Sequence, residues 1–213
     1  MSRRSIDLTL YLVTDRALAR GRPLEWIVRE ALRGGATAVQ LREKTATSRE
    51  FVECAERIRE LTAKAGVALI VNDRVDVALA VDADGVHVGQ ADLPAARARR
   101  LLGPQRMLGV TVAEARLAEQ ARLDGADYLG SSAVFATPTK PDSGPPIGLA
   151  GLRELVQASA LPLVAIGGIH AGNVRAVLET GVAGVAVVSA IVAAEDPRAA
   201  ALELAGIVRE ARR

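Results

Sequence analysis

The sequence predicts a single-domain (β/α)₈ TIM barrel over residues 1–213. Two observations lead to this fold class. Short apolar runs alternate eight times with longer amphipathic stretches, and the apolar runs are nearly continuous, as in parallel strands covered on both faces. The chain has 213 residues, half of them hydrophobic, which just meets the usual size of such a barrel and supplies one core.

The expected elements follow in βα order. Strands are expected at 8–13, 38–41, 68–71, 85–88, 107–110, 128–130, 162–166 and 182–188. Helices are expected near 24–33, 48–64, 75–81, 94–102, 113–123, 149–158, 173–180 and 197–212, with a short extra helix at 189–193. Glycines at the ends of four helices, within 34–36, 65–67, 124–126 and 180–182, supply left-handed cap residues. An open doubly wound sheet stays an alternative, although no GxGxxG motif follows the first strand.

Charge and composition argue against nucleic acid and membranes as partners. The chain carries 27 Lys and Arg against 25 Asp and Glu, and aromatic residues make up only 2% of it, so neither a basic surface nor a stacking platform is expected. No run of 18 apolar residues occurs, and the N-terminus does not resemble a signal peptide. We therefore expect a cytoplasmic protein, and the sequence leaves open whether it forms a homo-oligomer.

The one cysteine and the two histidines give little indication of a functional site. Cys54 lies in a helical pattern without a neighbouring His or Cys, which favours a buried packing role. His87 lies within the fourth strand, where a core histidine is favoured over a catalytic base, and His170 is expected in an exposed loop at a helix start. No HExxH, CxxC or Ser-His-Asp pattern supports zinc, redox or acyl-transfer chemistry.

Polar residues and glycines follow every expected strand from the second onward. In a (β/α)₈ barrel the carboxyl ends of the strands meet at one rim, and this rim carries the active site. The residues expected there are Gln40, Arg42, Lys44, Asn72, Asp73, Asp92, Thr111, Thr137, Thr139, Lys140, Gly167, Gly168 and Ser189.

Two of these residues form a candidate metal site. Asp73 and Asp92 end neighbouring strands, so their carboxylates repel each other unless a cation lies between them. Hard oxygen ligands suit Mg²⁺, which binds one or two carboxylates together with phosphate oxygens. The cations Arg42, Lys44 and Lys140 face the same mouth and match a diphosphate. Taken alone, Asp92 also fits a helix N-cap, because it comes just before the helix expected from residue 94.

A second anion site is expected across the mouth. Gly167 and Gly168 allow backbone N–H groups to approach a ligand, and Ser189 opens the short helix at 189–193. A tight turn is the alternative role of the glycine pair. Two separate phosphate sites indicate two phosphorylated small-molecule substrates.

Several motifs, and their order along the chain from about residue 10 to residue 193, resemble those of the thiamine phosphate synthase family. They are QLREK at 40–44, ND at 72–73, DGVHVGQADLP at 84–94, VFATPTKPDSGPPIGL at 134–149, AIGGI at 165–169 and VVSAI at 187–191. The resemblance implies that an aminopyrimidine diphosphate is held by Gln40, Arg42, Lys44, Asn72, Thr111 and Lys140, and Mg²⁺ by Asp73 and Asp92. It also implies that a thiazole phosphate is held by Thr137, Thr139, Gly168, Val188 and Ser189.

The resemblance further implies a dissociative substitution that joins the two heterocycles. Mg²⁺ and the catalytic residues Lys140, Arg42 and Thr111 stabilise departing pyrophosphate, the aminopyrimidine supports a transient cation, and the thiazole nitrogen attacks it. No strong protein base is required. The chain departs from the family at 131–133 and Ala136, where Gly or Pro is frequent, and at Thr111, where Ser is common.

Other functions stay open at this stage. A thiazole tautomerase of the same superfamily needs an acid or base beside Val134, where this chain has Ala133. An isomerase or aldolase needs a base or a Schiff-base lysine on a strand, and none is evident. A non-catalytic phosphate-binding barrel would tolerate loss of Asp73, Asp92 or Lys140, yet all three are present.

Overall fold

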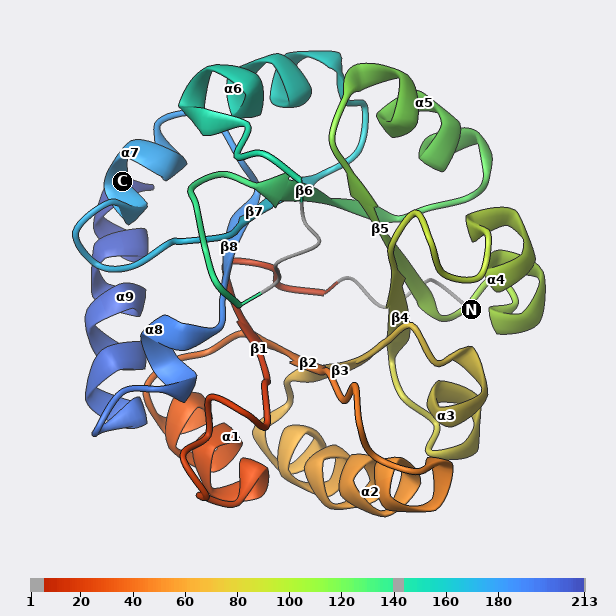
Figure 1. The fold of residues 1–213 in the computed structure, drawn as a ribbon, viewed down its shortest axis with the longest axis vertical. Coiled ribbons are helices and arrows are strands. Elements are labelled where there is room, and N and C mark those ends of the chain that lie inside the picture. Colours follow the sequence, from red (N-terminus) through yellow and green to blue (C-terminus); the bar gives the residue numbers. More distant parts are fainter. Residues whose placement is uncertain (1–5, 140–143, 213) are drawn as a thin grey trace.

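A computed structural model describes residues 6–139 and 144–212. Within these residues, eight parallel strands close into a barrel in the order β1 to β8, with β8 paired to β1. Helices surround the barrel on the outside (Figure 1). The predicted (β/α)₈ barrel is thereby confirmed, and the open doubly wound sheet is wrong.

The elements alternate along the chain as expected. The strands are β1 (Leu10–Val13), β2 (Ala38–Leu41), β3 (Ala68–Asn72), β4 (Gly85–Val88), β5 (Met107–Val112), β6 (Tyr128–Ala133), β7 (Leu163–Ile166) and β8 (Gly184–Val187). The helices are α1 (Leu24–Arg33), α2 (Ser48–Ala65), α3 (Val75–Ala80), α4 (Ala95–Leu102), α5 (Ala115–Leu123), α6 (Gly148–Ala158), α7 (Val174–Leu178), α8 (Ser189–Val192) and α9 (Pro197–Ala211). None of these described helices is long and apolar enough to cross a membrane.

Several strand ends differ from the expected ones. β5 and β6 were expected to end at residues 110 and 130 but continue to Val112 and Ala133. Strand pairing uses backbone groups, so polar side chains do not stop it. Thr111 pairs with Gly130 in this extension. β1 and β8 are shorter than 8–13 and 182–188, since their mutual pairing covers only the central residues of each apolar run. Apolar sequence therefore located the strands but not their ends.

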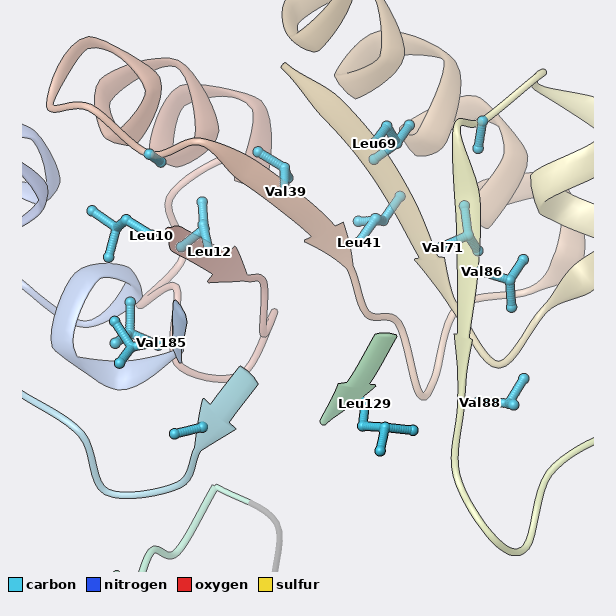
Figure 2. Close-up of a cluster of buried hydrophobic side chains, with 14 of the residues drawn as sticks. Leu10, Leu12, Val39, Leu41, Leu69, Val71, Val86, Val88, Leu129 and Val185 are labelled. Carbon is cyan, nitrogen blue, oxygen red and sulfur yellow. The ribbon is translucent and has the colours of Figure 1, made fainter. Parts of the chain in front are cut away.

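Every strand is buried on both sides, which explains the continuous apolar runs. Alternate side chains point outward under the helices, among them Leu10, Leu12, Val39, Leu41, Leu69, Val71, Val86 and Val88 (Figure 2). The intervening side chains fill the barrel interior, where the buried cluster comprises Leu8, Tyr11, Val13, Ala38, Ile70, Tyr128, Val164 and Ala186. Such two-sided burial is typical of parallel sheets. The interior differs from the outer layer in holding two tyrosines.

Buried carboxylates tie strands together at the amino ends of β4 and β6. Asp127 precedes β6, accepts a hydrogen bond from the N–H of Leu108 at 2.8 Å and pairs with Arg99 of α4. Asp84 precedes β4 and accepts from the N–H of Leu69 at 2.9 Å. A charged acceptor makes each of these bonds stronger than a neutral one. The end of the barrel opposite the expected active site is thus held by charge-assisted contacts.

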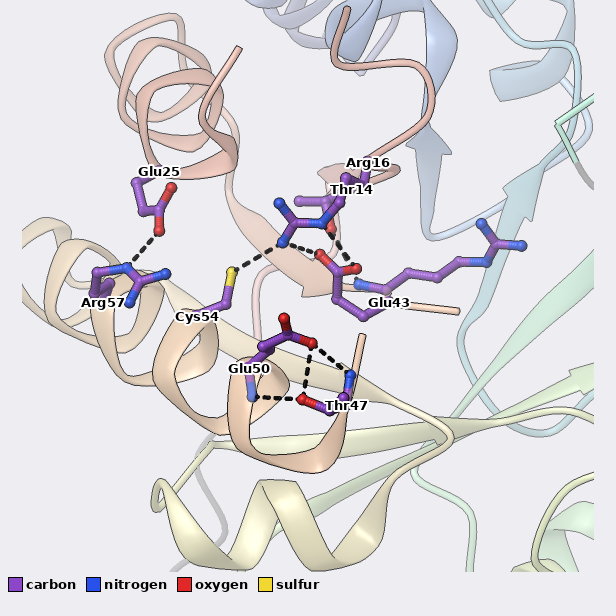
Figure 3. Close-up of polar contacts among 9 residues, drawn as sticks. Thr14, Arg16, Glu25, Glu43, Thr47, Glu50, Cys54 and Arg57 are labelled. Atoms are coloured by element: carbon purple, nitrogen blue, oxygen red, sulfur yellow. Dashed lines mark hydrogen bonds and ion pairs between the residues drawn. The ribbon is translucent and has the colours of Figure 1, made fainter. Parts of the chain in front are cut away.

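Helix ends follow the capping rules. Thr47 and Glu50 form a reciprocal capping box at the start of α2, in which each side chain accepts from the backbone N–H of the other residue (Figure 3). The glycines predicted to close four helices have the positive φ that this role needs: 101° at Gly35, 68° at Gly66, 88° at Gly125 and 91° at Gly181. These predicted caps are confirmed.

Two glycines make room for ring side chains inside the barrel. A Cβ atom on Gly109 would lie 2.2 Å from Cζ of Tyr128 and 2.4 Å from Nδ1 of His87. A Cβ atom on Gly130 would lie 2.9 Å from Cε1 of His87. Side chains cannot approach so closely in a packed interior. Position 109 therefore accepts only glycine while the two rings stay in place.

Gly109→Ala is expected to lower the free energy of unfolding by about 3 kcal/mol, because the added methyl must displace a packed ring. Gly206→Ala serves as the matched control, since no heavy atom lies within 4 Å of the added Cβ in the middle of α9. There the change should raise the free energy of unfolding by about 0.5–1 kcal/mol through helix propensity. Urea denaturation followed by circular dichroism measures both, and equal stabilities would contradict the packing described.

Candidate active site

A cavity of about 460 Å³ opens where the carboxyl ends of the strands meet. It is lined by all the predicted site residues that the structure describes: Gln40, Arg42, Lys44, Asn72, Asp73, Asp92, Thr111, Thr137, Thr139, Gly167, Gly168, Val188 and Ser189. The remaining one, Lys140, lies outside the described residues. The barrel thus brings the predicted residues together in one place, as expected for the rim of this fold.

The two carboxylates of the candidate metal site lie next to each other at the ends of β3 and β4. Burial first, and then the neighbouring Asp92, raise the pKa of Asp73 above its usual range, against the opposing effect of Lys44. Nζ of Lys44 lies 2.6 Å from Oδ2 of Asp73. Asp73 has a positive φ of 62°, an uncommon conformation in which Asp is enriched, and its N–H donates to the carbonyl of His87 at 2.8 Å. This strained position keeps the carboxylate at the rim.

The alternative role of Asp92 as a helix cap is wrong. The cap residue of α4 is Pro94, and no side chain caps that helix. Oδ2 of Asp92 instead accepts the backbone N–H of Gly89 at 2.7 Å, which closes the turn after β4. In the part of the chain that the structure describes, no group of three or more His, Cys, Asp or Glu side chains is suited to a metal. A metal at this rim would therefore need ligands besides these two carboxylates.

The charged residues of the QLREK motif divide between the cavity and the helix layer. Nη1 of Arg42 lies 2.7 Å from Oδ2 of Asp15, and both side chains are largely buried at the cavity edge. Glu43 turns the other way, where its buried carboxylate lies 2.6 Å from Arg16 near Cys54 (Figure 3). The segment after β2 thus supplies charges both to the cavity, with Arg42 and Lys44, and to the helix layer, with Glu43.

Asp15 is a site residue that sequence reasoning missed. It follows β1 at the same rim, and its carboxylate both pairs with Arg42 and accepts the backbone N–H of Leu18 at 3.1 Å. Its position directly after the first apolar run was the available signal. A fixed carboxylate beside a guanidinium holds that cation in one orientation.

Five polar side chains form a connected line of hydrogen bonds on the cavity floor. Nε2 of Gln40 donates to the Tyr11 hydroxyl at 3.0 Å, and the hydroxyls of Tyr11 and Tyr128 are 3.0 Å apart. Nδ1 of His87 lies 3.1 Å from the Tyr128 hydroxyl, and its Nε2 lies 2.9 Å from Oγ1 of Thr111. His87 is therefore buried in the interior as predicted, with both ring nitrogens bonded. The two tyrosines are site residues that the sequence did not reveal.

The other side of the cavity is built from the loop after β7. Gly167 and Gly168 have φ values of 101° and 67°, and a Cβ atom on Gly168 would lie 2.8 Å from Cβ of Phe135. The carbonyl of Gly168 accepts a hydrogen bond from Nδ2 of Asn173 at 2.9 Å. The glycine pair therefore packs directly against the loop that carries Thr137. Ser189 begins α8, which covers 189–192 rather than the expected 189–193.

Cys54 and His170 do not line the cavity. Burial raises the pKa of the Cys54 thiol to about 11, which keeps it protonated and a poor nucleophile at neutral pH. His170 lies in the exposed turn before α7, where its Nδ1 accepts the N–H of Gly172 at 3.1 Å. Both residues thus have the places that the sequence predicted for them.

Comparison with known proteins decides the family. The sequence model described as thiamine monophosphate synthase matches residues 10–191. The chain belongs to this family. The thiamine-phosphate synthase of Chloroflexus aurantiacus is 56% identical over 203 residues, covering 95% of this chain and 94% of the relative. The enzyme of that name from Moorella thermoacetica is 53% identical over 203 residues, covering 95% and 97%.

A solved structure agrees with this assignment. Thiamine phosphate pyrophosphorylase from Pyrococcus furiosus superposes with a TM-score of 0.89 at 47% sequence identity, and the match covers 96% of this chain and 97% of that one. The family expected from the sequence motifs is confirmed, and with it the expectation of a transferase that forms thiamine phosphate. A non-catalytic barrel and an aldolase or isomerase are thereby set aside.

Proposed function

We propose that the chain joins 4-amino-2-methyl-5-(diphosphooxymethyl)pyrimidine to 4-methyl-5-(2-phosphooxyethyl)thiazole, forming thiamine phosphate and releasing pyrophosphate. One observation carries the proposal: a single cavity brings the motif cations and the carboxylate pair together with a glycine loop, in a chain closely similar to thiamine-phosphate synthases. Such a cavity has separate places for a diphosphate and a monophosphate.

The pyrimidine diphosphate is assigned to the side of the cavity formed by β2 to β5. Arg42 and Lys44 supply positive charge for the diphosphate, and Lys140 is assigned the same task from the sequence. Gln40, Asn72 and Thr111 line the neighbouring wall with amide and hydroxyl groups that can hydrogen-bond a heterocycle. Asp15 orients Arg42 and so pre-organises one of the cations.

Asp73 and Asp92 fit a divalent cation of the Mg²⁺ type. Both offer hard oxygen ligands, and the raised pKa of Asp73 reflects burial beside a second carboxylate that a cation would relieve. Phosphate oxygens and water would complete the ligand set. When bound, the ion supplies neutralising charge for the diphosphate as it departs.

The reaction breaks the C–O bond between the pyrimidine methylene and the diphosphate. The bonding electrons leave with pyrophosphate, whose growing charge Arg42, Lys44 and Lys140 stabilise. The electron-rich aminopyrimidine stabilises the methylene cation, and the lone pair of the thiazole nitrogen forms the new C–N bond. No proton is transferred, so the residues need to position and stabilise rather than to act as a base.

The thiazole phosphate is assigned to the loops after β6 and β7 and to the segment after β8. Gly168, Val188 and Ser189 line the cavity there, and Thr137 and Thr139 add hydroxyl groups. Phosphorylated substrates on both sides are small polar metabolites, which supports a cytoplasmic location.

A turnover assay tests the proposal directly. Purified protein is incubated with both phosphorylated heterocycles and Mg²⁺, and thiamine phosphate and pyrophosphate are measured by chromatography. Equal amounts of the two products, formed only when both substrates are present, are expected. Release of pyrophosphate from the pyrimidine alone would show a hydrolase, and absence of any product would refute the function.

Asp92→Asn is expected to reduce the gain in pyrophosphate affinity that Mg²⁺ gives. The gain in the unmodified chain should be about tenfold or more, in line with a directly bound ion. Asparagine keeps an oxygen for the Gly89 N–H and removes only the charge. Asp82→Asn, at an exposed carboxylate before β4, is the matched control. Titration calorimetry with Mg²⁺ and with a chelator decides, and equal affinities in the unmodified chain would remove the metal from the proposal.

Lys140→Ala is expected to lower kcat by about 10²-fold, as for the loss of one pre-organised charge at a developing anion. Substrate affinity should change less, because the charge acts most strongly on the transition state. Lys64→Ala, at an exposed lysine of α2, is the control. Single-turnover kinetics at saturating substrates isolates the bond-breaking step. A rate within about threefold of the unmodified chain would deny Lys140 this role.

Gly168→Ala is expected to weaken thiazole phosphate binding by about tenfold or more, because the methyl pushes the loop at Phe135 away from the backbone donors. Affinity for the pyrimidine diphosphate should stay within about threefold. Gly66→Ala has nearly the same φ of 68° but no heavy atom near the added Cβ, so it controls for backbone strain. Separate calorimetric titrations measure both ligands. Equal losses for the two would mean that the sites are not divided in this way.

A further inference from the structure

The carbonyl groups of the glycine pair after β7 are both bonded to protein donors. The carbonyl oxygen of Gly167 accepts the N–H of Phe135 at 3.1 Å, and that of Gly168 accepts Nδ2 of Asn173 at 2.9 Å. Both peptide units are trans, so the C=O and the N–H of each unit point in opposite directions. The N–H groups of these units belong to Gly168 and Ile169. Each is therefore turned away from the group that binds its carbonyl.

These two N–H groups have no hydrogen-bond partner among residues 6–139 and 144–212. Ile169 is nevertheless only 5% exposed, and both Gly168 and Ile169 line the cavity. Buried backbone N–H groups are almost always bonded to protein, to water or to a ligand. Successive backbone N–H groups at a concave surface are typical of anion-binding sites. The pair is therefore available to a ligand in the cavity.

The side-chain amide of Asn173 has only one orientation that satisfies its neighbours. Oδ1 accepts the backbone N–H of His170 at 2.9 Å, and Nδ2 donates to the carbonyl of Gly168. A backbone N–H can only donate and a backbone carbonyl can only accept, so exchanging the amide atoms would break both bonds. Asn173 thus holds the loop on both sides of Ile169.

The glycine pair cannot fix the peptide after Gly168 by itself. Gly167 and Gly168 have positive φ values of 101° and 67°, and glycine has access to more backbone conformations than any other residue. Glycine is required at position 168 because a Cβ atom there would lie 2.8 Å from Cβ of Phe135. The residue that allows this close packing also leaves the next peptide free to rotate. A bond from outside the pair, the one from Asn173, is needed to hold it.

We propose that the N–H groups of Gly168 and Ile169 together bind the thiazole monophosphate, and that Asn173 is the positioning residue that keeps the second of them directed at the cavity. This deepens the proposed function and rests on it. A phosphate monoester carries about two negative charges and three acceptor oxygens, so it can accept from both N–H groups at once. Hydrogen bonds to a charged acceptor are stronger than those between neutral groups.

Amide NMR tests the two donors in the unmodified chain. The ¹⁵N-labelled protein is titrated with 4-methyl-5-(2-phosphooxyethyl)thiazole and, separately, with the aminopyrimidine diphosphate. An Ile169→Val variant assigns the isoleucine signal. The amide protons of Gly168 and Ile169 are both expected to move downfield with the thiazole phosphate, because a charged acceptor deshields the proton that it binds. The aminopyrimidine diphosphate should leave both signals nearly unchanged.

Two variants test the positioning role of Asn173. Asn173→Ala removes both amide bonds without adding charge, and it should weaken thiazole phosphate binding by about tenfold or more and abolish the downfield shift of Ile169. Affinity for the aminopyrimidine diphosphate should stay within about twofold. Asn173→Asp keeps an acceptor for the His170 N–H but places an oxygen against the Gly168 carbonyl, so at least the same loss is expected.

His170→Ala is the matched control in the same turn. The His170 ring accepts the N–H of Gly172, so its removal should leave thiazole phosphate affinity within about twofold and keep the Ile169 shift. Titration calorimetry measures the affinities of all three variants. A loss for His170→Ala as large as that for Asn173→Ala would indicate a general effect of the turn and overturn the role of Asn173.

The measurements separate a positioning role from a purely structural one. Equal losses of affinity for the two substrates, or an Ile169 shift that persists in Asn173→Ala, would overturn the proposal. If Asn173→Ala does not fold, the Ile169 signal of the unmodified chain and the Asn173→Asp titrations still decide. Thiazole phosphate binding without a shift of Ile169 would refute only this inference, whereas failure of the unmodified chain to bind that ligand would refute the proposed function.

Discussion

Closure of the parallel strands is the constraint on which the rest of the structure depends. It places the carboxyl end of every strand at one rim, so residues as far apart in sequence as Gln40 and Ser189 line the same cavity. It also leaves a narrow interior that side chains must fill. The tyrosine and histidine rings fit there only because Gly109 and Gly130 contribute no side chain.

The amino end of the barrel contributes to stability, whereas the carboxyl end carries the candidate active site. At the amino end, Asp84 and Asp127 are paired with arginines and backbone N–H groups, so their charges stabilise the fold. At the carboxyl end, Asp73 adopts a positive φ and is buried beside a second carboxylate, Asp92, which raises its pKa even though Lys44 lies 2.6 Å away. The rigid closed sheet makes this unfavourable arrangement tolerable at the rim.

Fold and family could be predicted from the sequence because both rest on local patterns. Continuous apolar runs located the strands, and motifs such as QLREK located the rim residues. Strand ends could not be predicted, since backbone pairing of Thr111 with Gly130 ignores side-chain polarity. The roles of Asp15 and Tyr128 could not be predicted from the sequence for another reason. Each depends on a partner from another segment of the chain, and a tyrosine in an apolar run is indistinguishable from ordinary core.

At the rim, the ammonium of Lys44 is the counter-ion of the Asp73 carboxylate. An ammonium 2.6 Å from the carboxylate must move before any divalent cation can take that oxygen, so metal binding alone meets a competitor inside the protein. A diphosphate would give the displaced ammonium a new anionic partner. In the proposed function the two ligands would therefore be coupled thermodynamically, each improving the other's affinity. Occupancy would then depend on both concentrations together, and the protein would respond more steeply to its metabolite supply than a single independent site.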